Sequence, residues 1–454
     1  GCCIYLFFCQ LSIVLQQNCK TEEINWCGFG FLCYNICYLI FCKERGNIPM
    51  KFAVVLCDGM SDMPGGMLGG KTPMEIAKKP VMDWLAANGE VGLIRTVPDG
   101  MPPGSDVANL TVLGYDVLEC YTGRAPLEAA SIGIDLKDDD VAFRCNLVTL
   151  SQEQDYFQKK LVDYCAGDIN TAEADILIRE IQSAFGGAEF DFYTGTSYRH
   201  CMVWHGGKTD LGEITPPHDI IGKPIAGYLP QRPNASPLLD IMRQSFEILN
   251  SHPLNERRVK DGLNPANAVW LWGQGKRPTL QPFEQRYEVK GSVISAVNLI
   301  KGIGHIARMN VCEVRGATGY IDTNYEGKTA AALSELQNGQ DFVFIHIEAP
   351  DECGHRGETG NKIKAIEDID SRVIKPLLEG LERMGDFKIM VLPDHPTPLA
   401  LRTHTSEPVP YLIYSSLDSP ASGIAGFNEN NASKAGRLFN PGYDLIKHFL
   451  QHGI

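Results

Sequence analysis

The stretch FAVVLC, Phe52–Cys57, decides the fold, because it is a continuous apolar run rich in β-branched residues that ends in Asp58-Gly59. Such a run is typical of a strand buried in a parallel sheet. Two later runs have the same character, FVFIHI at Phe342–Ile347 and KIMVL at Lys388–Leu392, and acidic residues follow both. Ligands gather at the carboxyl ends of strands in open α/β sheets. The three runs therefore predict one sheet edge that carries several carboxylates.

Strands and helical patterns alternate from Met50 onward, which predicts a largely parallel sheet covered by helices. The stretch 72–89 (TPMEIAKKPVMDWLAANG) has helical apolar spacing and a terminal glycine stop. Residues 120–285 are more polar and contain Gly- and Pro-rich turns. We predict an α/β protein in which residues 50–119 and 286–454 form one domain, with a second α/β domain inserted at 120–285.

The chain of 454 residues is too long for one simple core, and its formal net charge is -14. A surface with this charge repels nucleic acid and acidic membranes. We therefore expect neither as a partner of the enzyme part. An anionic substrate would need a local positive site made of metal ions or clustered Arg and Lys side chains.

Residues 1–49 differ from the rest, because they hold eight of the 15 cysteines. Their apolar stretches, Leu6–Leu15 and Gly28–Cys42, are shorter than the roughly 18–20 residues that span a bilayer. We interpret this segment as an upstream extension or gene-start error outside the enzyme; a membrane anchor is the alternative. The other seven cysteines have no metal-finger spacing and are typical of a reduced, cytoplasmic protein.

Carboxylates and imidazoles follow the predicted strands. Asp351 and His355 (DECGH) are four residues apart, which brings both side chains to one side of a helical turn. Each pattern alone is common by chance, but the whole set offers enough ligands for two divalent ions. Its members are Asp58, Asp351, His355, Asp394, His395 and His404.

A candidate nucleophile lies in PPGSDVANLTVLG, Pro102–Gly114. Gly104 permits close approach of a ligand, and Ser105 precedes a stretch of helical character whose free N–H groups can face a phosphate. A serine hydroxyl needs a base or a metal for activation. From the local pattern alone, the default interpretation is instead that Ser105 is the N-cap of the helix.

At this point the residues resemble the cofactor-independent phosphoglycerate mutases, particularly the archaeal-type branch and its bacterial relatives, within the alkaline phosphatase superfamily. The resemblance covers Met50 to Ile454 and none of residues 1–49. It implies an alkaline-phosphatase-like three-layer αβα core. The stretches that carry it include PPGSDVANLTVLGYD, YTGRAPLEAASIGIDL, GLNPANAVWLWGQG, HIEAPDECGHRGE and VLPDHPTPLALRTHTSEPVP.

The resemblance also implies roles for the candidate residues. Ser105 resembles the serine that is transiently phosphorylated. The ligands of one metal are implied to be Asp58, Ser105, Asp394 and His395, and those of the other to be Asp351, His355 and His404. The family uses two divalent ions, most often manganese, with magnesium, cobalt or zinc as variants, and does not need 2,3-bisphosphoglycerate.

Substrate contacts follow from the same resemblance. Lys301 (NLIKGIG) resembles the lysine that stabilises the transferring phosphoryl group, and Arg199 and His200 (SYRHCMVW) resemble contacts from the inserted domain. Further candidates are Arg124, Arg144, Lys276, Arg277 and Lys328. Rigid Arg forks suit carboxylates and phosphates, although most Arg and Lys side chains in any protein only solubilise its surface.

The reaction implied is the interconversion of 3-phosphoglycerate and 2-phosphoglycerate, an isomerase activity of glycolysis and gluconeogenesis on a small-molecule substrate. One alternative is a small-molecule kinase such as homoserine kinase, but the chain has no GxxxxGK[ST] nucleotide motif. A phosphatase or phosphodiesterase on the same metal core is another. A metal-binding scaffold without activity is a third, and the intact set of seven residues argues against it. The oligomeric state is left open.

Overall fold

The computed structural model describes residues 50–65, 68–212, 214–417 and 421–451. Contacts within Met50–Ile454 make this part of the chain one unit. The expectations for residues 1–49 lie outside the described residues. None of the described helices has the length and apolar character needed to cross a membrane.

Within the described residues, eight strands form the main sheet, in the order β13-β2-β12-β11-β1-β10-β8-β9. Their bounds are β1 Lys51–Cys57, β2 Glu90–Ile94, β8 Gly291–Ile294, β9 Asn310–Cys312, β10 Phe342–Ile347, β11 Phe387–Leu392, β12 Val409–Ser415 and β13 Leu438–Phe439. Strands β11, β1, β10, β8 and β9 run parallel, and β12 is antiparallel to both of its neighbours. The largely parallel sheet is therefore confirmed.

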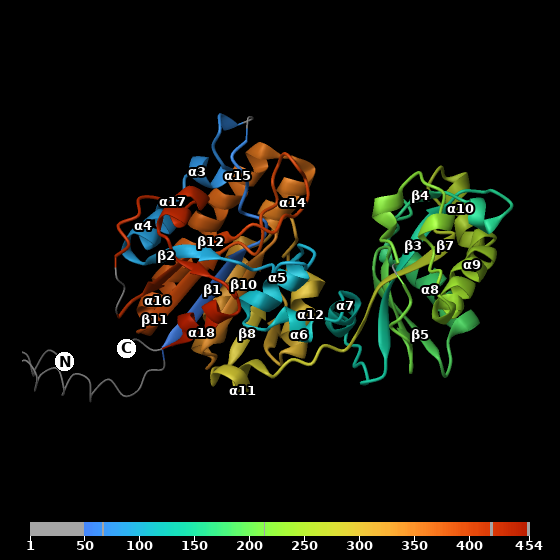
Figure 1. Ribbon diagram of the computed structural model, residues 1–454, viewed down its shortest axis with the longest axis horizontal. Coiled ribbons are helices and arrows are strands. Elements are labelled where there is room, and N and C mark those ends of the chain that lie inside the picture. The colour runs from blue at the N-terminus through green and yellow to red at the C-terminus, as the bar shows by residue number, and fades with distance from the viewer. Residues whose placement is uncertain (1–49, 66–67, 213, 418–420, 452–454) are drawn as a thin grey trace, which may run out of the picture. The chain divides into compact units, whose positions relative to one another are not determined.

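Helices cover both faces of this sheet (Figure 1). One face packs against α5 Ser105–Val112, α6 Val117–Cys120, α11 Phe283–Tyr287, α12 Asn298–Ile306 and α18 Asp444–Leu450. The other packs against α3 Pro73–Ile76, α4 Pro80–Asn88, α13 Tyr325–Gln337, α14 Ala349–Arg356, α15 Thr359–Asp368, the π-helical η6 Ile369–Ile374, α16 Lys375–Met384 and α17 Glu429–Lys434. Two apolar cores on either side of one sheet make the three-layer αβα architecture, which is confirmed.

The helix predicted over residues 72–89 is two helices. Helix α3 ends at Ile76, and α4 begins only at Pro80. A proline disfavours helical backbone in the residue before it, and Lys79 has φ -132° and ψ 61°. The apolar spacing continues across the break because both helices face the same core. The single-helix prediction was therefore wrong.

A second, antiparallel sheet lies between residues 141 and 276, in the described part of the chain. Its strands are β3 Val141–Leu150, β4 Leu161–Asp163, β5 Phe190–Thr196, β6 Arg199–Trp204 and β7 Ala268–Lys276, with β3 between β6 and β7. Helices α8 Thr171–Phe185, α9 Ser236–Asn250 and α10 Pro253–Lys260 and short 3-10 turns (Tyr156–Gln158, Pro217–Ile220, Ala226–Tyr228, Pro233–Ala235) complete a core of their own. The sheet lies within the region predicted as an insertion; the boundaries 120 and 285 stay predictions.

Candidate metal centre

The carboxyl ends of β11, β1 and β10 lie side by side, because these three strands are parallel neighbours. Asp58 follows β1 and Asp394 follows β11 after one intervening residue. The backbone N–H groups of Gly59 and His395 donate to Asp394 Oδ1, at 3.1 and 2.9 Å. Both carboxylates are buried, so the sheet edge predicted to carry acidic side chains holds two of them out of contact with water.

Ser105 is the first residue of α5, and Gly104 is the N-cap, with no side-chain cap. The default interpretation of Ser105 as an N-cap was therefore wrong. Ser105 Oγ instead lies 3.1 Å from His395 Nε2. One turn later, Asn109 Nδ2 donates to Ser105 O at 2.8 Å and to Asp394 Oδ2 at 2.9 Å, which ties the serine to the carboxylate.

A second set of candidate ligands comes from α14 and the loop after β11. His355 Nε2 lies 3.3 Å from Asp351 Oδ2, and His404 Nε2 lies 3.4 Å from Asp351 Oδ1. The Nε2 atoms of the two histidines are only 2.8 Å apart. The hydrogen bond from His355 to Asp351 raises the pKa of His355 to about 9. The spacing of four residues does bring Asp351 and His355 together.

These residues fit divalent cations. Ligand atoms of Asp58, Asp394 and His395 lie within 4.8 Å of one another, and so do those of Asp351, His395 and His404. Asp58 Oδ1 is buried and has no hydrogen-bond partner among the described residues. Burial and the neighbouring carboxylates of Asp394 and Asp351 raise the pKa of Asp58 well above its usual range. Converging buried carboxylates with free lone pairs need a compensating positive charge, which cations bound by these donors would supply.

Several residues around these ligands were not predicted from the sequence. Thr397 Oγ1 donates to Asp351 Oδ1 at 2.5 Å and lies 3.3 Å from His395 Nδ1, so it contacts a ligand of each group. Lys362 is fully buried and donates from Nζ to Asp62 Oδ2 and Thr397 O, both at 2.8 Å. Of these residues, only Asn109 could have been predicted from the sequence. It follows Ser105 by four residues, a spacing that brings two side chains together on one side of a helix.

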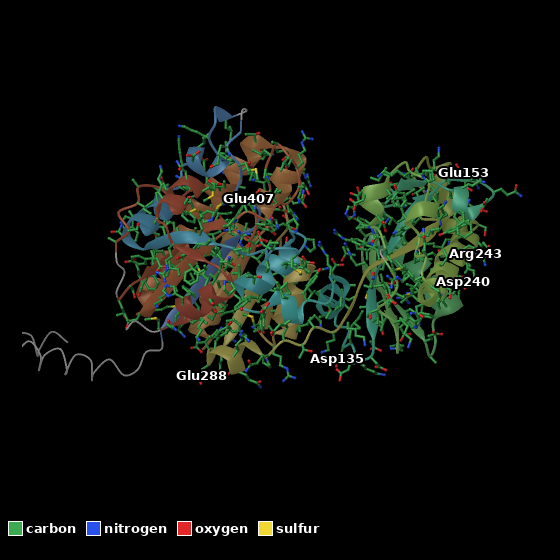
Figure 2. The ribbon with its side chains drawn as sticks, viewed as in Figure 1. Asp135, Glu153, Asp240, Arg243, Glu288 and Glu407 are labelled. Carbon is green, nitrogen blue, oxygen red and sulfur yellow. The ribbon has the colours of Figure 1, made fainter. Side chains whose placement is uncertain are left out.

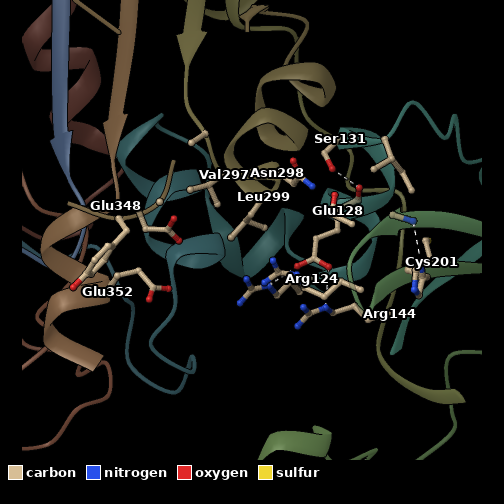
Figure 3. Close-up of a pocket in the computed structure, with 18 of the residues that line it drawn as sticks. Arg124, Glu128, Ser131, Arg144, Cys201, Val297, Asn298, Leu299, Glu348 and Glu352 are labelled. Atoms are coloured by element: carbon tan, nitrogen blue, oxygen red, sulfur yellow. Dashed lines mark hydrogen bonds and ion pairs between the residues drawn. The ribbon is translucent and has the colours of Figure 1, made fainter. Parts of the chain in front are cut away.

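A cavity of about 470 Å³ lies among the arginines, a volume that suits a small-molecule ligand. Its lining contains several charged side chains. They are Arg124, Glu128, Arg144, Arg199, Glu348, Glu352 and Arg356. Figure 3 shows Arg124 and Arg144 beside Glu128, with Glu348 and Glu352 on the opposite side. The cavity adjoins the candidate metal ligands along the chain, because Glu348 is the N-cap of α14 and Glu352 directly follows Asp351 on that helix.

Positive charge is in excess on the arginine wall. Glu128 pairs with Arg124 Nε at 2.9 Å and with Arg144 Nε at 2.8 Å. Burial alone would raise the pKa of Glu128, but Arg144 and Arg124 outweigh it and the pKa is lowered. One carboxylate thus faces two guanidinium groups, that of buried Arg144 and that of partly exposed Arg124, and Arg199 lines the same cavity. Asp240 and Glu407, labelled in Figure 2, are exposed acidic residues that do not line this cavity.

His200 lines the same cavity and is buried. Its Nδ1 accepts the N–H of Gly195 at 3.1 Å, so a neutral ring carries its proton on Nε2. Burial lowers the pKa of His200 to about 3, which keeps the ring neutral. Nε2 has no hydrogen-bond partner among the residues that the structure describes. His200 therefore has a buried N–H donor without a partner in the described structure, in a residue that lines the cavity.

The remaining predicted substrate residues lie elsewhere. Lys301 is on α12 and donates to both carboxylate oxygens of Glu313 at 2.8 Å. Lys276 ends β7, and Arg277 donates to Asp135 at 3.1 Å beside a smaller cavity of about 250 Å³. Lys328 is fully buried and donates to His346 O at 3.0 Å. None of these four is among the residues that line the larger cavity in the described structure.

Comparison with known proteins identifies the family. The profile of the 2,3-bisphosphoglycerate-independent phosphoglycerate mutases matches residues 86–255. A probable mutase of this kind from Geobacter sulfurreducens is 50% identical over 401 residues, which cover 88% of this chain and 100% of that protein. The mutase of Methanosarcina barkeri is 49% identical, over 87% of this chain and 98% of its own length.

Solved structures agree with the sequence relatives. A protein from Pyrococcus horikoshii superposes with a TM-score of 0.73 at 30% identity, over 89% of this chain and 99% of that one. The cofactor-independent phosphoglycerate mutase of Thermoplasma acidophilum gives a TM-score of 0.61 at 27% identity, with the same coverage. Since relatives that share up to half of their residues are matched along nearly their whole length, this chain belongs to the family of 2,3-bisphosphoglycerate-independent phosphoglycerate mutases.

Proposed function

We propose that this protein interconverts 3-phosphoglycerate and 2-phosphoglycerate in glycolysis and gluconeogenesis, without 2,3-bisphosphoglycerate. The observation that carries the proposal is the position of Ser105 Oγ, 3.1 Å from His395 Nε2 and beside two groups of cation ligands, in a chain of this family. A serine there is suited to accept a phosphoryl group and return it.

Two divalent ions are part of the proposal. Asp58, Ser105, Asp394 and His395 would hold one, and Asp351, His355 and His404 the other. Bound cations lower the cost of deprotonating a serine hydroxyl and offset charge on a phosphoryl group. Manganese is our first choice, with magnesium, cobalt or zinc as variants, because sites made of imidazole and carboxylate groups accept all four.

Ser105 is proposed as the nucleophile. Its hydroxyl loses a proton, Oγ forms a bond to phosphorus, and the bond from phosphorus to the C3 oxygen of the substrate breaks. That oxygen takes up a proton, which leaves glycerate and phosphoserine. In the return step the C2 hydroxyl of glycerate loses its proton and attacks phosphorus, and the bond to Oγ breaks. Protons balance over the cycle, and no outside reactant is consumed.

The arginine-lined cavity is proposed to hold the anionic groups of glycerate and its phosphate. Arg124, Arg144 and Arg199 provide more positive charge than Glu128 cancels, and guanidinium forks suit carboxylates. His200, which lines the same cavity, is proposed as a further substrate contact. For four further residues, a role in substrate binding requires that they leave their present contacts when substrate binds. These residues are Lys276, Arg277, Lys301 and Lys328.

The cellular setting is also a proposal. The seven described cysteines are all free, which supports a reducing, cytoplasmic location. The partner would be the small phosphoglycerate substrate rather than nucleic acid, which the net charge of -14 repels.

An enolase-coupled assay tests the proposal. Purified protein loaded with manganese should convert 3-phosphoglycerate to 2-phosphoglycerate with neither ATP nor 2,3-bisphosphoglycerate, and Ser105→Ala should abolish the conversion. Phosphohomoserine formed from ATP and homoserine, with no mutase activity, would support the kinase alternative instead.

A further inference from the structure

A histidine lies inside the apolar core, on the central strand β10. The strand reads FVFIHI, and each of its residues is fully buried. Side chains alternate between the two faces of a strand, so His346 points to the same side as Phe342 and Phe344. That side is covered by α5 and α12. An imidazole where neighbouring positions hold phenylalanine must find hydrogen-bond partners for both nitrogens, or its burial is costly.

His346 has both partners. Its Nε2 lies 3.0 Å from Asp58 Oδ2, and its Nδ1 lies 3.3 Å from Ser295 Oγ. Ser295 directly follows β8, and the register of β8 with β10 pairs Ile294 with Ile345, which brings Ser295 beside His346. Both side chains are fully or almost fully buried.

The direction of these hydrogen bonds follows from Asp58, because an ionised carboxylate can only accept and Nε2 of His346 must then carry the proton. The backbone N–H of Val297 donates to Ser295 Oγ at 3.0 Å. The hydroxyl proton of Ser295 is then free for His346 Nδ1, and a neutral ring with this tautomer donates from Nε2 to Asp58. This series of hydrogen bonds begins at Val297, which lines the cavity in Figure 3. It ends at Asp58, a carboxylate of the candidate metal centre.

The two oxygens of Asp58 therefore have different surroundings. Oδ2 accepts the proton of His346, whereas Oδ1 is buried, has no hydrogen-bond partner among the described residues, and lies 3.6 Å from His395 Nε2. A carboxylate held through one oxygen cannot rotate freely about its terminal bond. The other oxygen is left directed at the ligand group that Asp58 shares with Asp394 and His395.

We propose that Ser295 and His346 are positioning residues that fix the Asp58 carboxylate and thereby set the cation affinity of its site. The inference rests on the proposed function, because it needs a cation at Asp58. Hydrogen-bond partners behind a metal ligand commonly contribute 10- to about 100-fold in affinity, because they orient the ligand before the metal arrives. Neither residue is proposed to contact the cation or the substrate.

The test is manganese binding by calorimetry, with electron paramagnetic resonance of the bound ion as a second readout. His346→Leu removes the donor to Asp58 and should weaken one of the two binding events by about 10–100-fold, leaving the other unchanged. Ser295→Ala should cause a smaller loss, because His346 can still donate. His346→Gln, whose amide can occupy the position of Nε2, should recover part of the affinity.

Phe344→Leu is the matched control. Phe344 is equally buried on the same face of β10, but its side chain takes no part in the hydrogen bonds that lead to Asp58. It should lower the melting temperature and leave both affinities as in the wild type. The inference would be overturned if His346→Leu, or the double variant with Ser295→Ala and His346→Leu, bound both ions with wild-type affinity. The proposed function would remain intact in that case. A wild-type protein that binds no divalent ion would overturn both.

Discussion

At the scale of single residues, Gly59 shows how closely the metal centre is packed. Its φ is +60°, in the region that favours glycine, and a Cβ there would lie 2.5 Å from Asp351 Oδ1 and 2.6 Å from Thr397 Oγ1. The residue after Asp58 therefore has to be glycine for two reasons, backbone conformation and space.

We predict that Gly59→Ala abolishes activity and weakens cation binding, because the new methyl group displaces Asp351 and Thr397. Gly69→Ala is the control, since Gly69 has nearly the same φ, +63°, but nothing within 4 Å of its added Cβ. Both variants should lose about 1 kcal/mol of stability from the strained backbone, and Gly59→Ala should lose more because of the clash, as measured by urea unfolding. Equal activity in the two variants would show that the packing at Gly59 does not matter.

At the scale of elements, α15 holds two loops of the metal centre together through Lys362. Its ammonium group donates to Ser61 O, Asp62 Oδ2 and Thr397 O, so the loop after β1 and the loop after β11 share one buried cation. The loops carry Asp58 on one side and Asp394, His395 and His404 on the other.

We predict that Lys362→Met lowers the free energy of unfolding by about 3–5 kcal/mol, because the Asp62 carboxylate stays buried without its partner. Lys364→Met on the same helix is the control; its side chain is 55% exposed and pairs with Asp368, and it should cost less than about 1 kcal/mol. Chemical denaturation of both variants measures the difference. Equal, small losses would mean that the buried pair does not hold the loops.

In the second sheet, His205 joins strand ends through two carboxylates. It lies 2.8 Å from Asp140 Oδ1, just before β3, and 2.9 Å from Asp191 Oδ2 on β5. The hydrogen bonds to Asp191 and then Asp140 raise the pKa of His205 above its ordinary value. A raised folded-state pKa means that the stabilisation is complete below about pH 6.5 and is lost as pH rises through the folded-state pKa.

We predict that His205→Gln destabilises the protein more at about pH 6 than at about pH 9. Tryptophan fluorescence reports on this sheet, since Trp204, Trp270 and Trp272 belong to its strands. The free energies of unfolding of both proteins, measured at several pH values, should converge as pH rises. A difference that widens with pH would contradict the protonated state assigned to His205.

At the scale of the whole molecule, the sequence predicts what depends on short-range pattern. Strand β10 has the predicted bounds, and β1 and β11 each begin one residue earlier than predicted, because a buried strand is a continuous apolar run. The carboxylates that follow these strands then share one edge by topology alone. The break before Pro80 was missed since apolar spacing persists across it.

Side-chain contacts between distant segments could not be predicted in this way. Thr397 meets Asp351, and His346 meets Asp58, only because parallel strands bring their ends together. Neither residue type carries a signal of its role, since threonines and buried histidines are common. The same holds for the cavity, where Arg124 and Arg144 share Glu128 through separate elements.

In the proposed reaction, Ser105 takes a phosphoryl group and returns it to glycerate rather than to water. Phosphorus NMR of 3-phosphoglycerate with magnesium-loaded protein follows both phosphoglycerates and free phosphate in one sample. We expect 2-phosphoglycerate to appear while inorganic phosphate does not, and we expect no change in the spectrum with Ser105→Ala. Release of inorganic phosphate without 2-phosphoglycerate, or conversion by Ser105→Ala at the wild-type rate, would contradict the proposed reaction.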